Sequence, residues 1–457
     1  MKSLQPRRLL SLLLPALFST QYAQAAITLD LTSQDSIKAA ARTAAEGMMR
    51  YYTGDRPGDI PGNLPQPYYW WEAGAMFGAM IDYYYFTGDD HWNNVTMQAM
   101  LHQTGPDNDY MPPNQTKTEG NDDQGFWGMA AMSAAENNFP NPPSNRAQWL
   151  ALAQAVFETQ ARRWDNATCD GGLRWQIFTF NNGYNYKNTI SNGCFFNLAS
   201  RLAVYTGNQT YARWADTAFN WTDSIGLIDD NWNFFDGTDV NLRCKEFDHL
   251  QWSYNAGVYL AGAANMYNFT EGSDVWRRRI EGIISNLKYF MPDGNNIISE
   301  VTCEPLGNCN IDQRSFKAYL ARWMAMAAVK APFAYDAIKP ILEDSAAAAA
   351  RSCSGGDDGN QCGLKWTTST FDGSVGVGEQ MSALEVIQAN LIDYVEGPVT
   401  ADTGGTSSGD PNAGAGSRVL PGDLNRSVVT TGDRVGAGFL TVLVICFVAG
   451  GAWWLIS

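Results

Sequence analysis

Apolar residues recur at three- to four-residue spacing through most of the chain, as they do on the buried face of a helix. Many of these stretches begin with Ser, Asp or Asn and end at Gly or Pro, the residues that start and stop helices. The pattern predicts twelve helices, near residues 33–53, 67–87, 90–104, 122–136, 144–163, 190–206, 208–226, 252–268, 272–291, 313–331, 333–351 and 378–396. Residues 26–398 contain no linker-like break, so we expect one large domain there.

Three pairs of these helices are joined by short glycine-containing turns, each followed by an aromatic residue. The turns are Tyr84–Asp89, Ala203–Asn208 and Met266–Gly272, and the aromatic residues are Trp92, Tyr211 and Trp276. Tight turns force neighbouring helices to lie antiparallel. Six such hairpins can close into a ring, so the expected fold class is all-α, an (α/α)6 barrel of six helical hairpins. An open α-solenoid is the alternative, and the irregular period of the repeat disfavours it.

Two segments between the helices have other patterns. Residues 171–180 alternate like a β-strand and precede an Asn-Asn-Gly turn, so a strand is expected there. Residues 229–239 are rich in Asp but lack the residue order of a calcium loop, and a hairpin turn at Asp236–Gly237 is the better prediction. With three histidines and no paired Cys-x-x-Cys spacing, neither zinc nor another cofactor is expected.

The beginning of the chain has the order of a secretory signal. Arg7 and Arg8 precede an apolar run from Leu9 to Phe18, and Ala23-Gln-Ala25 supplies small residues for cleavage. The run is too short to span a bilayer. We therefore assign residues 1–25 to a signal peptide, the alternative being a buried first helix.

The end of the chain predicts a lipid anchor. Residues 399–434 are rich in Gly, Ser and Thr, and residues 435–457 form an apolar tail with no Lys or Arg after it. This order is typical of a glycosylphosphatidylinositol (GPI) signal, whose tail is removed on anchoring. The attachment residue would lie among Ala413–Ser417 or near Asn425. A single transmembrane helix is the alternative, since the tail is long enough, but no basic residue follows to hold it.

Sequons and cysteines agree with a secreted protein at the outer face of the plasma membrane or in the cell wall. Seven Asn-x-Ser/Thr sequons occur, at Asn94, Asn114, Asn166, Asn208, Asn220, Asn268 and Asn425. The pairs Cys303/Cys309 and Cys353/Cys362 are close in sequence with turn-forming residues between them. Cys194 lies in a helical apolar pattern and is expected to be a buried free thiol. By elimination, Cys169 pairs with Cys244.

The chain is acidic, and its net charge limits the classes of ligand that it can bind. It carries 31 Lys and Arg against 47 Asp and Glu, a formal net charge of −16. Both terminal segments carry more bases than acids, so their removal makes the charge more negative. Such a protein repels nucleic acid and is compatible with a neutral, hydroxyl-rich ligand.

Polar and aromatic residues cluster at the predicted starts of alternate helices, which in a barrel lie at one mouth. Aromatic faces stack on sugar rings, and amides and carboxylates bind sugar hydroxyls. Many of the 16 Trp and 20 Tyr must nevertheless lie in the core. The clusters are residues 68–72, 121–124, 187–192, 251–255, 312–317 and 378–380, and the substrate-binding candidates from them are Trp71, Asn121, Gln124, Asn188, Asn192, Trp252, Tyr254, Phe316 and Glu379.

Asp122 and Asp123 stand where a loop turns into a helix. Two carboxyl groups held close repel each other, so one can keep its proton while the other is ionised, as cleavage of a glycosidic bond requires. Neighbouring Cα atoms are about 3.8 Å apart, and diverging side chains could place the carboxyls ~5–5.5 Å apart, the spacing of retaining enzymes. An inverting enzyme needs about 6.5–9.5 Å. Helix capping is the alternative role for the pair.

Three motifs in order, at 121–127 (NDDQGFW), 186–193 (YKNTISNG) and 251–257 (QWSYNAG), resemble the signature of glycoside hydrolase family 76. The resemblance covers most of residues 27–396. With both terminal signals, the chain looks like the fungal membrane-anchored branch of that family. The resemblance implies an (α/α)6 barrel that acts on α-1,6-linked mannose with retention, with Asp122 as nucleophile and Asp123 as general acid/base.

The resemblance also implies a role in cell-wall biogenesis. The donor would be α-mannan or the GPI glycan of anchored proteins, and transfer to β-glucan in the wall would use the same covalent intermediate as hydrolysis. Two other functions stay open at this point. One is a catalytically silent, carbohydrate-binding wall protein on the same barrel, and the other is an inverting (α/α)6 glycosidase, which the adjacent aspartates disfavour.

Overall fold

The computed structural model describes residues 27–417 except 293, together with 438, 440, 441 and 444–446. The expected signal peptide, Asn425 and most of the apolar tail lie outside the described residues. Within the described part of the chain, no helix is long and apolar enough to cross a membrane.

Twelve α-helices lie in residues 27–417, and they correspond one to one to the twelve predicted from the sequence. Most ends agree within a few residues, although the fifth helix starts five residues late and the last ends in a 3-10 turn. The helices are α1 (Gln34–Met49), α2 (Trp70–Thr87), α3 (Asn93–His102), α4 (Asn121–Glu136), α5 (Trp149–Arg162), α6 (Thr189–Thr206), α7 (Gln209–Ser224), α8 (Ser253–Phe269), α9 (Asp274–Asn286), α10 (Phe316–Lys330), α11 (Tyr335–Ser352) and α12 (Val377–Gln388).

Short elements fill the connections. The 3-10 turns are η1 (Thr116–Thr118), η2 (Val240–Leu242), η3 (Leu287–Phe290), η4 (Glu304–Leu306), η5 (Gln313–Ser315), η6 (Pro332–Ala334), η7 (Trp366–Thr368) and η8 (Ala389–Tyr394). The strands are β1 (Tyr186–Asn188), β2 (Gly237–Asp239), β3 (Phe247–Asp248), β4 (Cys353–Gly355) and β5 (Gln361–Cys362). Strands β1, β2 and β3 form an antiparallel sheet in that order, and β4 pairs with β5.

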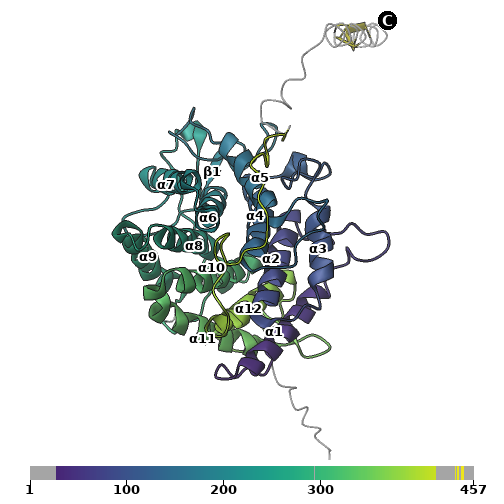
Figure 1. The fold of residues 1–457 in the computed structure, drawn as a ribbon, viewed down its shortest axis with the longest axis vertical. Helices are drawn as coiled ribbons and strands as arrows, with labels where there is room; N and C mark the ends of the chain where they lie inside the picture. The colour runs from purple at the N-terminus through teal and green to yellow at the C-terminus, as the bar shows by residue number, and fades with distance from the viewer. Residues whose placement is uncertain (1–26, 293, 418–437, 439, 442–443, 447–457) are drawn as a thin grey trace, which may run out of the picture.

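The helices form two concentric rings (Figure 1). The even-numbered helices are the inner ring: each of α2, α4, α6, α8 and α10 packs against the next, and α12 returns to α2. The odd-numbered helices lie outside them. Gly88 and Gly207 end α2 and α6 in the left-handed conformation, at φ 75° and 68°, which lets the chain reverse at once. The expected (α/α)6 barrel is confirmed.

Glycine lets neighbouring helices approach closely, both between the two rings and within the inner ring. A Cβ on Gly128 of α4 would lie 2.7 Å from Val156 of the outer helix α5, and one on Gly257 of α8 would lie 3.0 Å from the Cα of Leu320 on α10. Both separations are shorter than a van der Waals contact. The Gly- and Ala-rich helix faces seen in the sequence therefore set the spacing of the barrel.

The interior of the barrel is filled below its mouth. Phe126, Tyr319 and Trp323 pack on one another at centroid distances of 4.9 to 6.3 Å. They are all buried, with at most 3% of each residue exposed. This aromatic layer comes from α4 and α10 and forms a floor across the ring.

Beneath the floor, buried charged residues join five inner helices. Arg201 of α6 contacts Glu136 of α4 at 2.6 Å. Arg322 of α10 contacts Asp82 of α2 at 3.0 Å and Glu385 of α12 at 2.6 Å. Buried charges are tolerated when paired in this way. We refer to this side of the barrel as the closed end.

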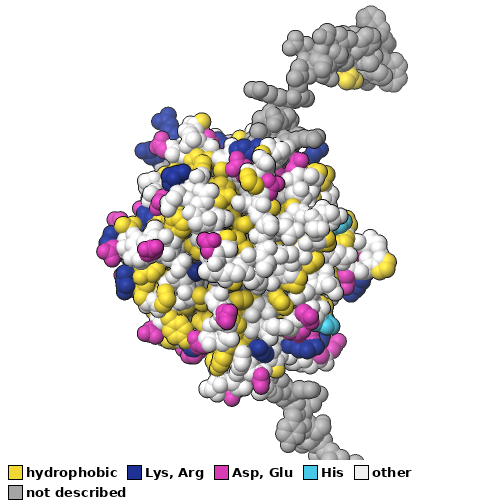
Figure 2. Space-filling model, viewed as in Figure 1, with side chains coloured by type: hydrophobic (Ala, Val, Ile, Leu, Met, Phe, Trp, Pro, Cys, Tyr) yellow, Lys and Arg dark blue, Asp and Glu magenta, His cyan; other side chains and the backbone are white. Residues whose placement is uncertain are grey.

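Three disulfides join the cysteine pairs expected from the sequence, Cys169–Cys244, Cys303–Cys309 and Cys353–Cys362. Cys194 is a buried free cysteine, also as expected. Of the seven sequons, the six that lie in described residues all have exposed asparagines, so each is open to modification. Acidic and basic side chains are interspersed over the face drawn in Figure 2.

Two local predictions were wrong. Residues 171–180 do not form a strand; only Gln176 makes an isolated bridge, to Gly120. Their backbone bonds go elsewhere, because the Leu173 N–H donates to the Asn192 side chain and the Trp175 N–H to the Tyr186 carbonyl. The hairpin turn expected at Asp236–Gly237 lies instead near Asp229 to Trp232, and Gly237 begins strand β2.

Candidate active site

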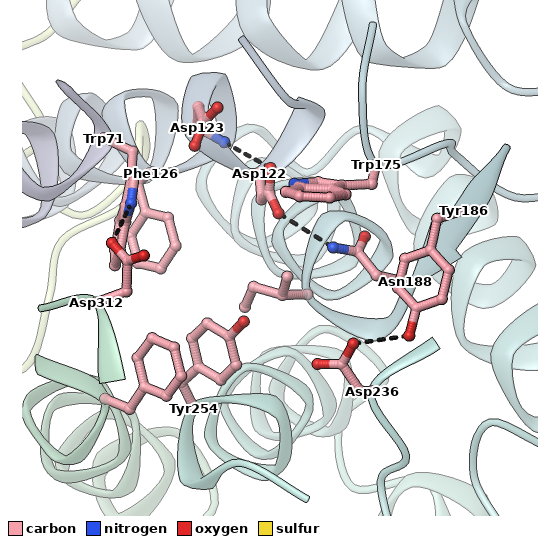
Figure 3. Close-up of a pocket in the computed structure, with 12 residues that line it drawn as sticks. Trp71, Asp122, Asp123, Phe126, Trp175, Tyr186, Asn188, Asp236, Tyr254 and Asp312 are labelled. Atoms are coloured by element: carbon pink, nitrogen blue, oxygen red, sulfur yellow. Dashed lines mark hydrogen bonds between the residues drawn. The ribbon is translucent and has the colours of Figure 1, made fainter. Parts of the chain in front are cut away.

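A pocket opens at the mouth formed by the N-terminal ends of the inner helices (Figure 3). It encloses about 630 Å³ of space, part of it open to solvent. Its walls combine four carboxyl groups with aromatic rings, and no Lys or Arg is among the described residues that line it. The lining residues are Trp71, Asp122, Asp123, Phe126, Trp175, Tyr186, Asn188, Ile190, Asp236, Tyr254, Asp312 and Phe316.

Asp122 and Asp123 occupy the first turn of α4 and are held differently. Asp122 accepts hydrogen bonds from the Asn188 side-chain amide at 3.2 Å and from the Asp123 backbone N–H at 3.0 Å. Asp123 accepts a 2.6 Å bond from the backbone N–H of Gly120, which precedes the helix. Asp123 therefore caps α4 and also lines the pocket. The capping role that the sequence offered as the alternative is thus present beside the position in the pocket.

Burial controls the protonation of the pair. It raises the pKa of Asp123 to about 6 and that of Asp122 well above its usual value, where the charge of Asp123 adds to the rise. The bonds from Asn188 and from the Asp123 N–H oppose this rise by favouring ionised Asp122. Two interacting carboxyls titrate as a unit, so the pair holds one proton at pH values where free aspartates have lost both.

Gly120 leaves room for the Asp122 carboxyl. A Cβ at this position would lie 2.3 Å from Asp122 Oδ1 and 3.1 Å from the Trp175 carbonyl oxygen. The backbone of Gly120 is extended, at φ −88°, so alanine would fit the helix start but displace the carboxyl. We expect Gly120→Ala to stay folded and to lower kcat/KM about 10²-fold, the cost of an ~1 Å misplacement of a reacting group.

Steady-state turnover of an α-1,6-mannooligosaccharide, together with thermal unfolding, checks this expectation. Gly397→Ala is the matched control, because its Cβ would meet only Val329, at an ordinary 3.6 Å. Wild-type turnover by Gly120→Ala would show that the position of Asp122 is not restricted by this contact.

Two further aspartates face the pair across the pocket. Asp312 accepts a 3.1 Å hydrogen bond from the Trp71 indole N–H, and Asp236 accepts a 2.8 Å bond from the Tyr186 hydroxyl. Burial raises the pKa of each to about 6. The pocket thus carries negative charge that no cation on its described walls neutralises.

Four of the nine substrate-binding candidates line the pocket. Trp71 donates a hydrogen bond to the Asp312 carboxyl, and Asn188 donates one to the Asp122 carboxyl. Tyr254 and Phe316 stack face to face, with centroids 3.8 Å apart and planes inclined by 9°. Together with Trp175 they give the pocket flat apolar surfaces of the kind that sugar rings pack against.

Asn121 and Gln124 lie behind the pocket wall. Asn121 donates to the Arg174 carbonyl at 2.7 Å, and its own N–H donates to the Trp175 carbonyl at 2.8 Å, so it fixes the loop that carries Trp175. Gln124 is fully buried and donates to the Asp109 carbonyl at 2.7 Å. Both accept hydrogen bonds from buried Arg163.

The remaining three candidates also lie outside the lining. Asn192 binds both backbone groups of Leu173, accepting at 2.7 Å and donating at 3.1 Å. Trp252 packs edge-on against Phe316 at 5.6 Å. Glu379 is 1% exposed and pairs with Arg314 at 3.2 Å. These contacts support residues of the pocket or its rim.

The sequence candidates omit six residues that line the pocket. They are Phe126, Trp175, Tyr186, Ile190, Asp236 and Asp312. Four of them, Phe126, Tyr186, Ile190 and Asp312, fall inside motifs or clusters that the sequence had singled out, so a wider choice within them would have found these four. Trp175 and Asp236 come from loops, where no periodicity marks which side chain turns inward.

A family profile described as Glycosyl hydrolase family 76 matches residues 36–402. The chain belongs to this family of glycoside hydrolases. Among curated proteins, it is 48% identical over 446 residues to "Mannan endo-1,6-alpha-mannosidase DCW1" of Saccharomyces cerevisiae, covering 97% of this chain and 98% of the relative. It is 45% identical to the protein of the same name from Candida albicans, covering 94% and 96%.

Solved structures agree with this assignment. Dfg5 from Chaetomium thermophilum, crystallised in complex with glucosamine, is 48% identical, with a TM-score of 0.82 over 85% of this chain and 98% of that one. An inactive variant of the α-1,6-mannanase GH76A from Salegentibacter, in complex with α-1,6-mannotriose, has a TM-score of 0.63 over 79% and 99% at 17% identity. The second likeness concerns the fold.

Proposed function

We propose that this protein is a retaining glycosidase or transglycosylase that acts on α-1,6-linked mannose at the outer surface of a fungal cell. The observation that carries the proposal is the buried Asp122–Asp123 pair in an aromatic, acidic pocket. The names of the relatives, mannan endo-1,6-alpha-mannosidases, supply the bond to be cleaved.

The two carboxyls would act in succession. An oxygen of ionised Asp122 attacks the anomeric carbon, while Asp123 gives its proton to the glycosidic oxygen as the bond to the leaving sugar breaks. Asp123 then takes a proton from water or from a sugar hydroxyl, whose oxygen attacks the same carbon and releases Asp122. Two displacements at one carbon retain its configuration. The Asn188 amide and the Asp123 N–H, which both bind Asp122, support its role as the ionised partner.

The acceptor decides between hydrolysis and transfer. Water gives a shortened mannan chain, and a sugar hydroxyl, such as one on β-glucan, gives a new glycosidic bond. The GPI glycan of an anchored protein is a second donor in this proposal. The four carboxyls of the pocket suit a donor that carries an amino sugar with a protonated amine. The related Dfg5 structure holds glucosamine.

We further propose that residues 1–25 direct secretion and that a GPI anchor near Ala413–Ser417 or Asn425 holds the protein at the plasma membrane. The six exposed sequon asparagines and the three disulfides support an oxidising, secretory route.

Activity is expected to depend on pH through the aspartate pair. Below the first pKa of the pair both carboxyls are protonated and no nucleophile is present; above the second, no proton remains for the leaving oxygen. Because the charge of Asp123 raises the pKa of Asp122, the value of about 6 belongs to the first proton that the pair loses, and it sets the acid limb of kcat/KM. The charge of Asp312 raises the pKa of Asp123, so Asp312→Asn should move this limb to lower pH. The profile of kcat/KM against pH for both proteins is the measurement, and an unmoved limb contradicts the assignment.

One product analysis tests the proposed function. The secreted ectodomain is incubated with α-1,6-mannooligosaccharides, with and without a β-glucan oligosaccharide, and the products are identified by mass and anomeric configuration. Shorter α-configured products support hydrolysis, and longer or hybrid products support transfer. Absence of products and of a trapped glycosyl-enzyme would leave the carbohydrate-binding alternative in its place.

A further inference from the structure

Residues 398–417, which we call the C-terminal strap, follow η8 and have defined contacts along the outside of the barrel (Figure 1). The strap begins at the closed end. The Val399 N–H donates to the Glu136 carbonyl at the end of α4 at 2.8 Å, and the Ala401 N–H donates to the Tyr205 carbonyl near the end of α6 at 2.9 Å. The strap therefore starts at the end of the barrel opposite the pocket.

The strap then follows α5 along its length. The Ser407 hydroxyl accepts from the Leu150 N–H in the first turn of α5 at 2.9 Å, where the helix has no capping side chain of its own. The Asp410 N–H donates to the Gln154 side chain at 2.9 Å. A helix of this length rises about 20 Å. The strap thus crosses from the closed end towards the pocket end.

Its last described residues lie at the pocket end. Arg162, the last residue of α5, donates to the Gly414 carbonyl. Gly414 has a φ of 74°, and a Cβ there would lie 2.8 Å from the Ala155 carbonyl oxygen, so the backbone fits closely against α5. Ser417 is 7% exposed and lies beside Asp109, whose carbonyl accepts a hydrogen bond from Gln124 in the first turn of α4.

We propose that the C-terminal strap makes the chain leave the barrel at its pocket end, so that the pocket faces the lipid surface to which the protein is anchored. This inference rests on the anchoring in the proposed function. Residues 418–425 span at most ~28 Å when fully extended, about the ~27 Å rise of an 18-residue inner helix. An anchor at Ala413–Ser417 holds the pocket end at the membrane, and with an anchor near Asn425 the closed end reaches the membrane only when the tether is fully extended along the barrel.

The pocket would then bind a donor substrate that is itself attached to the same lipid surface. A donor glycan attached to a lipid and an enzyme tethered with its pocket towards that lipid meet at a raised effective concentration. A chain that left the barrel at residue 398 would instead place the closed end nearest the membrane. The strap thereby selects surface-held donors over free oligosaccharides.

Energy transfer to a labelled bilayer tests the orientation. The anchored protein carries a donor dye at Asn182→Cys, exposed at the pocket end, or at Asp90→Cys, exposed at the closed end. Cys446 leaves with the tail on anchoring, and the other free cysteine, Cys194, is buried. The labelled protein is reconstituted into phosphatidylcholine vesicles that contain an acceptor-labelled lipid. Position 90 should lie one barrel length farther from the membrane than position 182. Energy transfer from position 182 should therefore be at least about twofold greater than from position 90. Equal transfer, or greater transfer from position 90, overturns the proposal.

A flexible insertion separates orientation from anchoring. About 20 Gly and Ser residues placed after Ser417 have a mean reach of ~25 Å and should abolish the difference between the two dyes. They should also lower turnover of a lipid-linked mannooligosaccharide while turnover of the free oligosaccharide stays at the wild-type rate. Vesicle flotation is measured first: a protein that does not float contradicts the proposed anchor and the orientation together, whereas one that floats with equal transfer contradicts the orientation alone.

Discussion

Asp122→Asn should lower the kcat for α-1,6-mannooligosaccharides by about 10⁶-fold, as loss of the nucleophile does in a serine protease. The amide has nearly the shape of the carboxyl but neither its charge nor its nucleophilic oxygen. The side chain would still fit beside Asn188 and Gly120, which contact Asp122 in the pocket. Turnover of the purified ectodomain is the measurement, with unchanged thermal unfolding as the check on folding.

The neighbouring variant separates the two roles. Asp123→Asn should lower turnover of the oligosaccharide about 10²–10⁴-fold, the usual contribution of a general acid, but much less with an aryl mannoside whose phenol leaves without a proton. Asp122→Asn should be inactive on both substrates. The exposed Asp55→Asn is the matched control and should behave as wild type. If instead Asp122→Asn retains activity on the aryl mannoside and Asp123→Asn does not, the two roles are exchanged.

The second large effect is expected on stability, at the closed end. Arg201 is 1% exposed and binds Glu136 through two nitrogens, at 2.6 and 3.0 Å, as well as the Ser133 hydroxyl at 2.8 Å. Arg201→Met would leave the Glu136 carboxylate buried without its cation. Removal of one partner of a buried pair costs about 3–5 kcal/mol, which for a domain of this size lowers Tm by about 5 °C. Calorimetry or thermal unfolding followed by circular dichroism measures the shift.

Two further variants show whether the loss comes from the unpaired charge. The double variant Arg201→Met/Glu136→Leu removes both charges and should recover much of the stability, because apolar replacement of a whole buried pair is often neutral. The exposed pair Arg42–Glu46, at 3.0 Å, provides the contrast. Arg42→Met should change the free energy of unfolding by less than about 1 kcal/mol. A double variant no more stable than Arg201→Met would assign the loss to packing instead.

The barrel could be predicted from the sequence because its helices are defined by local signals. Periodic apolar positions gave each helix, and Gly88 and Gly207 marked the reversals between partners. Cys169 and Cys244 are 75 residues apart, yet elimination was enough to pair them because the other cysteines were accounted for by short loops and a helical pattern. Packing of the twelve helices into a ring followed from the short connections.

Long-range contacts within the site were not accessible in the same way. Trp175 enters the pocket because Asn121, Asn192 and Tyr186 bind the backbone around it, and nothing in the alternation of residues 171–180 reveals those bonds. The sequence shows equally little of why Gln124 turns away from the pocket while its neighbour Asp123 lines it. Along one helical turn, residues of similar polarity differ only in direction, and the direction is set by the elements that surround them.

The floor of Phe126, Tyr319 and Trp323 makes the active site a pit rather than a tunnel. A polysaccharide cannot thread through it, so both arms of a chain cut in its middle have to leave by the same opening. The backbone must therefore fold back at the bond that breaks. Linkages through the exocyclic C6 carbon have one more rotatable bond than linkages between ring carbons, and they make that bend at lower conformational cost. The shape of the barrel thus favours a flexible linkage before any side chain distinguishes one sugar from another.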